Sequence, residues 1–151
     1  MKRFFNYLWP VLLCFILGFA ASKFQSKSMV EWYPTLVKSP LTPPNIAFPI
    51  AWSVLYLFIG LALGRISGKG YKREVILWSV QMLLNFLWSI IFFTMRMPLL
   101  GFVDIILLDV VVMAFIYNVR NKDRVAFYLF IPYLIWLLFA TYLNAYILFN
   151  N

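Results

Sequence analysis

The sequence predicts an all-α membrane protein, a bundle of five transmembrane helices. Two observations lead to this fold class: 64% of the 151 residues are hydrophobic, and five long apolar runs alternate with segments that carry the basic residues. Only 12% of the residues are charged, whereas roughly a quarter are charged in an average soluble domain. A soluble fold of this length could not bury so much apolar surface, so lipid must be the solvent for most of it.

The five runs predict helices over about residues 4–22, 48–65, 74–96, 98–119 and 124–149, in a single domain that spans residues 1–151. Each run approaches or exceeds the roughly 17–25 apolar residues that cross a bilayer. The second run is the shortest, and its Pro49 falls in the first helical turn, where proline is tolerated. We therefore expect an integral, multi-pass protein, in the cytoplasmic membrane if the source is bacterial.

The first run has a second interpretation as a signal peptide. Two basic residues precede it, and the small residues Ala20 and Ala21 lie near its end. Against this interpretation, the run contains Trp9 and Pro10 and is long enough to span a membrane. A retained first helix is the prediction.

The basic residues are divided unequally between the two sides of the predicted bundle. Nine Lys and Arg residues fall on the side of the N-terminus, and four fall on the other, namely Lys23, Lys27, Lys38 and Arg96. Because cytoplasmic loops carry an excess of Lys and Arg, this distribution places the N-terminus inside. The net charge of +8 does not predict a nucleic-acid partner, because these cations lie between apolar runs and not on one solvated face.

One long connection, residues 23–47, separates the first two predicted helices. It contains Trp32, Tyr33 and several prolines, which favour extended backbone. Long loops of this kind often close over a binding site, so we interpret it as a lid. The alternative is a stiff connector whose aromatic residues lie at the membrane interface.

The composition excludes several kinds of catalytic and metal site. The chain has no histidine, and Cys14 is its one cysteine, so it can form neither an internal disulfide nor a zinc site of the His/Cys kind. Ser-His-Asp and Cys-His catalysis and a histidine-ligated haem are excluded as well. Asp104 and Asp109 point about 140° apart around a helix axis and cannot form a carboxylate pair on one face. We predict no metal and no resident cofactor.

Polar and aromatic side chains recur on single faces of three predicted helices. These stripes contain Gln81, Asn85 and Ser89 in the third helix, Tyr133, Trp136, Ala140 and Asn144 in the fifth, and Trp52 and Tyr56 in the second. Aromatic walls with a few hydrogen-bonding groups are typical of a small-molecule pocket. The alternative is that Asn and Gln only bond neighbouring helices together.

Small residues form two further patterns. Gly60 and Gly64 are spaced as GxxxG, and Cys14, Gly18 and Ser22 form a ridge on the first helix. Such ridges let two helices approach closely. They predict close packing within the bundle, with dimerisation as the alternative.

Three segments resemble one known family. WYPTLVKSPLTPPNIAFPIAWSVLY (residues 32–56), QMLLNFLWSIIFF (residues 81–93) and PYLIWLLFATYLN (residues 132–144) are similar, in this order, to motifs of the TspO/MBR family of tryptophan-rich sensory proteins. Animal members of this family include the peripheral-type benzodiazepine receptors. The resemblance implies a five-helix bundle, often a homodimer, whose pocket is closed by the first loop.

The resemblance also implies ligands and site residues. Family ligands include porphyrins such as protoporphyrin IX, isoquinoline carboxamides and benzodiazepines. Trp52 and Trp136 match two tryptophans that contact ligand and are implicated in light-dependent porphyrin breakdown. Other positions that match the family pocket are Tyr33, Phe48, Asn85, Phe86, Ser89, Ala140 and Asn144.

These observations predict a membrane receptor or sensor for hydrophobic small molecules, most of all porphyrins, with a lipid bilayer around it. A porphyrin is a flat aromatic disc that suits Trp and Tyr side chains, and Lys38 or Arg96 could meet its carboxylates. A light-dependent porphyrin-degrading enzyme and a small tetrapyrrole transporter are the alternatives. Sterol binding is not predicted, because no basic residue follows Tyr146, where animal members carry one.

Overall fold

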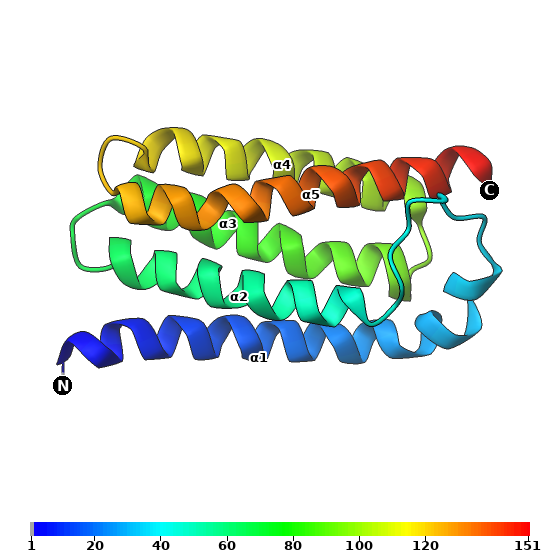
Figure 1. Ribbon diagram of the computed structural model, residues 1–151, viewed down its shortest axis with the longest axis horizontal. Helices are drawn as coiled ribbons and strands as arrows, with labels where there is room; N and C mark the ends of the chain where they lie inside the picture. Colours follow the sequence, from blue (N-terminus) through cyan, green and yellow to red (C-terminus); the bar gives the residue numbers. More distant parts are fainter. Residues whose placement is uncertain (1) are drawn as a thin grey trace.

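Five helices in the computed structural model run side by side along the long axis of the molecule (Figure 1). The structure describes the chain from residue 2 to residue 151, with side chains from Phe4 onward. Lys2 and Arg3, two of the nine basic residues assigned to the N-terminal side, have side chains outside this range. The helices are α1 (Lys2–Glu31), α2 (Ala47–Ile66), α3 (Lys72–Ser89), α4 (Pro98–Val119) and α5 (Arg124–Asn150). A π-helical turn, Ile90–Thr94, continues α3.

All five helices are long and apolar enough to cross a membrane, with mean hydropathy between 1.8 and 2.6. The all-α, multi-pass prediction is therefore confirmed. Four of the five predicted helices agree with the structure to within two residues at each end, when the π-helical turn is counted with α3. The termini lie at opposite ends of the bundle (Figure 1). We call the end that carries the C-terminus and the α1–α2 connection the loop end, and the other the turn end.

The first helix differs from its prediction, because α1 continues to Glu31 where the sequence predicted an end near residue 22. The apolar run stops there, but residues 23–31 contain no Pro or Gly to end the helix. Contacts with α3 and its π-helical turn then stabilise the polar extension: Gln25 Nε2 donates to Ser89 Oγ (3.0 Å), and Ser28 Oγ donates to the Phe93 carbonyl (2.6 Å). The predicted lid 23–47 is correspondingly shorter and begins at Trp32.

The helices pack in a closed ring in which α1 contacts α2, α2 contacts α5, α5 contacts α4, α4 contacts α3, and α3 with its π-helical turn contacts α1. Glycines bring α1 and α2 together toward the turn end. A Cβ added to Gly60 would lie 2.6 Å from Val11 Cα, and one added to Gly64 would lie 2.8 Å from the Asn6 carbonyl oxygen. The small-residue pattern thus serves packing within the chain.

Asp123 ties the short connections together at the turn end. Its buried carboxylate lies 3.0 Å from Arg65 Nη2 and 2.7 Å from Lys69 Nζ, and it also accepts the Ala126 N–H at the start of α5. Burial alone would raise the pKa of this carboxyl, but the bonds from Lys69, Ala126 and Arg65 outweigh it and hold the pKa below its ordinary value. The last turn of α2 is therefore fixed to the first turn of α5.

Candidate ligand-binding pocket

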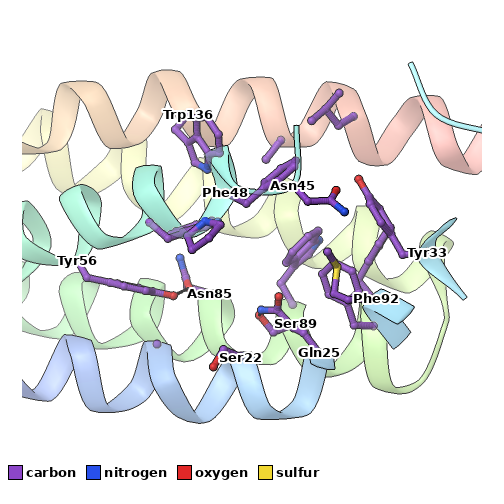
Figure 2. Close-up of a pocket in the computed structure, with 18 of the residues that line it drawn as sticks. Ser22, Gln25, Tyr33, Asn45, Phe48, Tyr56, Asn85, Ser89, Phe92 and Trp136 are labelled. Atoms are coloured by element: carbon purple, nitrogen blue, oxygen red, sulfur yellow. Dashed lines mark hydrogen bonds between the residues drawn. The ribbon is translucent and has the colours of Figure 1, made fainter. Parts of the chain in front are cut away.

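A cavity of about 500 Å³ lies inside the loop end of the bundle. Side chains of α1, α2, α3 with its π-helical turn, and α5 line it, and the α1–α2 connection contributes Tyr33 and Asn45 (Figure 2). This volume is within the range of sites for drug-sized ligands. Lining residues in the described chain include no Asp, Glu, Lys or Arg, so the cavity offers aromatic faces and neutral hydrogen-bonding groups.

Nine of the eleven residues predicted to bind ligand lie on the wall of this one cavity. They come from the connection, α2, α3 and α5: Tyr33, Phe48, Trp52, Tyr56, Asn85, Ser89, Trp136, Ala140 and Asn144. The helical stripes therefore converge on a common space, as the spacing of their residues suggested. Their contact with a ligand stays a prediction.

Phe86 and Tyr133 lie outside the lining. Phe86 packs edge to face against Phe24 of α1, with ring centroids 6.0 Å apart. Tyr133 is fully buried behind the wall, where its hydroxyl donates to Gln81 Oε1 (2.8 Å) and accepts from Asn85 Nδ2 (2.8 Å). Tyr133 thus orients the pocket residue Asn85. Gln81 bonds α3 to α5, which is the role that the alternative interpretation of the polar stripes predicted.

Neutral hydrogen bonds fix the polar groups of the wall. Tyr56 reaches toward Asn85, and Gln25 toward Ser89 (Figure 2). Asn144 joins two elements, because it accepts from Trp88 Nε1 at 3.0 Å and donates to the Pro98 carbonyl at 2.9 Å. Pocket wall and interhelical bonding are therefore combined in the same side chains.

Aromatic rings cover much of the remaining wall. Trp52 stacks on Tyr56 with centroids 5.5 Å apart, and Trp88 stacks on Phe92 at 5.0 Å. The indole N–H of Trp136 is buried and has no hydrogen-bond partner within the described chain. Flat rings in these positions can stack with a planar ligand.

Sequence reasoning missed the contribution of α1, which lines the pocket with Phe15, Gly18, Ser22, Gln25 and Met29. These residues follow one another at intervals of three or four, the spacing of a single helix face. The pattern continues past residue 22, so it was the signal that could have extended the helix and found this wall.

The α1–α2 connection is fixed to the end of α5. Ser39 Oγ lies 2.8 Å from Tyr142 Oη, and Asn151 exchanges two hydrogen bonds with the backbone of Val37. Lys38 donates to the carbonyls of Tyr33 (2.9 Å) and Leu36 (3.0 Å). These bonds hold the segment over the cavity, where a lid would lie.

The two predicted carboxylate-binding cations are both engaged with the protein itself. The Lys38 ammonium donates to backbone carbonyls of the connection, and Arg96 Nη2 lies 3.2 Å from Glu31 Oε2. The pocket residues themselves are uncharged. The carboxylates of a porphyrin would therefore have to project out of the cavity, because burying them unpaired would be costly.

Comparisons with known proteins agree with the motifs. A family model described as the TspO/MBR family matches residues 10–149. The chain is 40% identical to the tryptophan-rich protein TspO of Chlorobaculum tepidum, over 90% of this chain and 89% of the relative. It is 31% identical to a tryptophan-rich sensory protein of Cereibacter sphaeroides (92% and 90% covered) and to the translocator protein of Ovis aries (84% and 79% covered).

Proposed function

Because the chain belongs to the TspO/MBR family, we propose that it is a membrane receptor that binds a porphyrin such as protoporphyrin IX in the cavity at the loop end. Family membership and relatives with sensory and translocator names support the broader role of a membrane sensor or receptor. The observation that carries the proposal is the uncharged cavity of about 500 Å³ between Trp52, Trp88 and Trp136. Isoquinoline carboxamides and benzodiazepines, which are also flat and hydrophobic, are proposed as further ligands.

The chemistry of the wall favours a free-base porphyrin over haem. A haem iron takes an axial ligand such as the imidazole of histidine, and the sequence contains no histidine. Indole and phenol rings can instead stack on the macrocycle, while Asn85 and Gln25 offer neutral polar contacts.

A second candidate function is light-dependent breakdown of the bound porphyrin. The observation that favours it is the position of Trp52 and Trp136 on the wall of one cavity, with an unpartnered indole N–H on Trp136. Both rings would then lie against the chromophore when it absorbs light.

Titration with protoporphyrin IX, followed by tryptophan fluorescence quenching in the dark and under illumination, tests both functions. We expect saturable quenching in the dark, and Trp136→Leu should weaken binding at least about tenfold, because it removes a large stacking surface. Trp9→Leu is the matched control, because Trp9 is 49% exposed on α1 and lies outside the cavity. An absence of saturable quenching, or equal weakening by both substitutions, would contradict binding in this pocket.

A further inference from the structure

The exposed part of the pocket wall lies on one side of the bundle. Every exposed lining residue belongs to α1 or to the start of α2 and the connection before it: Phe15, Phe19, Ser22, Asn45, Pro49 and Ser53. The lining residues of α3, its π-helical turn and α5 are buried or half-buried. The cavity is therefore most open along the line where α1 meets α2.

Close packing between α1 and α2 extends from the turn end to the beginning of the cavity. Gly60 and Gly64 hold the two helices together near the turn end, and Gly18 lies against the Tyr56 ring at the beginning of the cavity. Beyond Gly18, the described residues of α1 and α2 form no side-chain hydrogen bond with each other.

The loop end of α1 is attached to α3 and its continuation. Gln25 bonds Ser89, Ser28 bonds the Phe93 carbonyl, and the Phe24 carbonyl accepts from Thr94 Oγ1 at 2.9 Å. Because these bonds join α1 to α3 and its π-helical turn, α1 can separate from α2 at this end without breaking them.

The hydroxyls along this opening are already satisfied within their own helices. Ser22 Oγ donates to the Phe19 carbonyl and Ser53 Oγ to the Pro49 carbonyl, both at 2.7 Å. A hydroxyl that bonds its own helix can face hydrocarbon without leaving an unsatisfied donor. Ser53 lies six residues after Ala47, about 9 Å along α2 at 1.5 Å per residue, within a helix that is long and apolar enough to cross a membrane.

We propose that the pocket takes its ligand sideways from the bilayer, through an opening between α1 and α2 bordered by Phe19, Ser22 and Ser53. The alternative route from water leads past the α1–α2 connection, which the bonds of Ser39 to Tyr142 and of Val37 to Asn151 tie to the end of α5. The proposal rests on the proposed binding function, and it defines the ligand class further as molecules dissolved in the membrane. Such ligands are concentrated by the lipid before they meet the protein.

Stopped-flow quenching with protoporphyrin IX, on the full chain in lipid nanodiscs, tests this route. The double variant Ser22→Phe, Ser53→Phe should narrow the opening. Because entrance and exit share one barrier, we expect the association and dissociation rate constants both to fall, each by at least about fivefold.

The chain offers a matched control. Ser26 and Ser79 are exposed, and they bond their own helices like Ser22 and Ser53, through the Lys23 and Val75 carbonyls. Neither lines the cavity, so Ser26→Phe, Ser79→Phe should leave both rate constants unchanged. Phe19→Ala gives an independent reading with little effect on folding, because Phe19 is 65% exposed; it should raise both rate constants.

Unchanged rates in both the double variant and Phe19→Ala would overturn the proposal. So would faster binding in Tyr142→Phe, which frees Ser39, combined with no effect of the α1–α2 substitutions, since this result would place the route at the connection. Failure of the proposed function is distinguishable from both results, because the unmodified protein would then show no saturable quenching at equilibrium.

Discussion

Phe48 and Trp136 pack edge to face, with ring centroids 6.0 Å apart and their planes at 72°. Phe48 lies in the first turn of α2, just after the α1–α2 connection, and Trp136 lies near the middle of α5. This contact joins the connection to the wall that also carries Trp52. The two tryptophans predicted to contact ligand thus lie on a single cavity, although they belong to helices that enter the bundle from opposite ends.

The first prediction concerns these tryptophans. Trp52→Phe and Trp136→Phe should each slow light-driven loss of protoporphyrin IX far more than they weaken its binding. Phenylalanine keeps a flat apolar ring but lacks the indole N–H and is harder to oxidise. The measurement is porphyrin absorbance under illumination, normalised to the bound fraction in the dark. Equal breakdown rates in both variants and the unmodified protein would contradict a role of the two tryptophans in breakdown, and they would then only form part of the pocket wall.

The second prediction concerns the connection. Replacement of Pro43 and Pro44 together by Gly should loosen this segment, because glycine restores backbone freedom that proline removes. We expect weaker retention of the ligand, with the off-rate raised by roughly threefold or more and a smaller change in the on-rate. Asn121→Gly, in the exposed turn before α5, is the control. An unchanged off-rate in a folded protein would make the segment a connector only.

The third prediction concerns Asp123. Asp123→Ala removes a buried carboxylate that pairs with Arg65 and Lys69 and caps α5, so it should reduce the free energy of unfolding by about 2–4 kcal/mol. Glu31→Gln breaks exposed pairs and should cost no more than about 0.5 kcal/mol. Thermal unfolding in detergent would measure both, and similar losses would contradict the special role of Asp123.

The same carboxylate gives a pH dependence. Its pKa is lower in the folded protein than in the unfolded chain, where Asp titrates near about 3.9. Its stabilising contribution is therefore fully present above that pH and is lost as the pH falls through the lower, folded value. Between about pH 5 and about pH 7, the free energies of unfolding of the unmodified protein and of the Asp123→Ala variant should therefore differ by a constant amount.

The fourth prediction tests the packing of α1 on α2. Gly60→Ala would place a Cβ 2.6 Å from the Val11 backbone and should destabilise the protein by about 1–3 kcal/mol. Gly101→Ala is the comparison, because its nearest contact is a side-chain atom of Phe92 at 3.2 Å, farther away than the Val11 backbone is from Gly60. The order of the two melting temperatures checks the prediction, and the reverse order would contradict it.

The fifth prediction is the orientation in the membrane, with the N-terminus inside. Lys38 lies in the connection at the loop end and Lys69 in the α2–α3 turn at the opposite end. Cysteines introduced at these positions, in a Cys14→Ala background, should be labelled from outside and inside respectively. Labelling of both from the same side would contradict the five-helix topology.

Much of this architecture was accessible from the sequence because hydrophobicity and periodicity are local properties. Apolar runs longer than a membrane crossing determined the five helices, and residues repeated every three or four positions determined which side chains share a face. Gly60 and Gly64 likewise revealed a close helix contact by their spacing, though not its partner. The absence of histidine excluded whole classes of metal and catalytic site.

Tertiary structure decided what depends on neighbours far along the chain. The polar end of α1 is helical because Gln25 and Ser28 find partners on α3 and its π-helical turn, which hydropathy could not reveal. Phe86, one residue from Asn85, faces Phe24 and not the cavity. Tyr133 lies behind the wall of the cavity, where its hydroxyl accepts a hydrogen bond from Asn85. The sequence by itself determined the helices and their faces, since both follow from local chemistry; only packing decided which faces enclose the cavity and where it opens, since both depend on how the five helices meet.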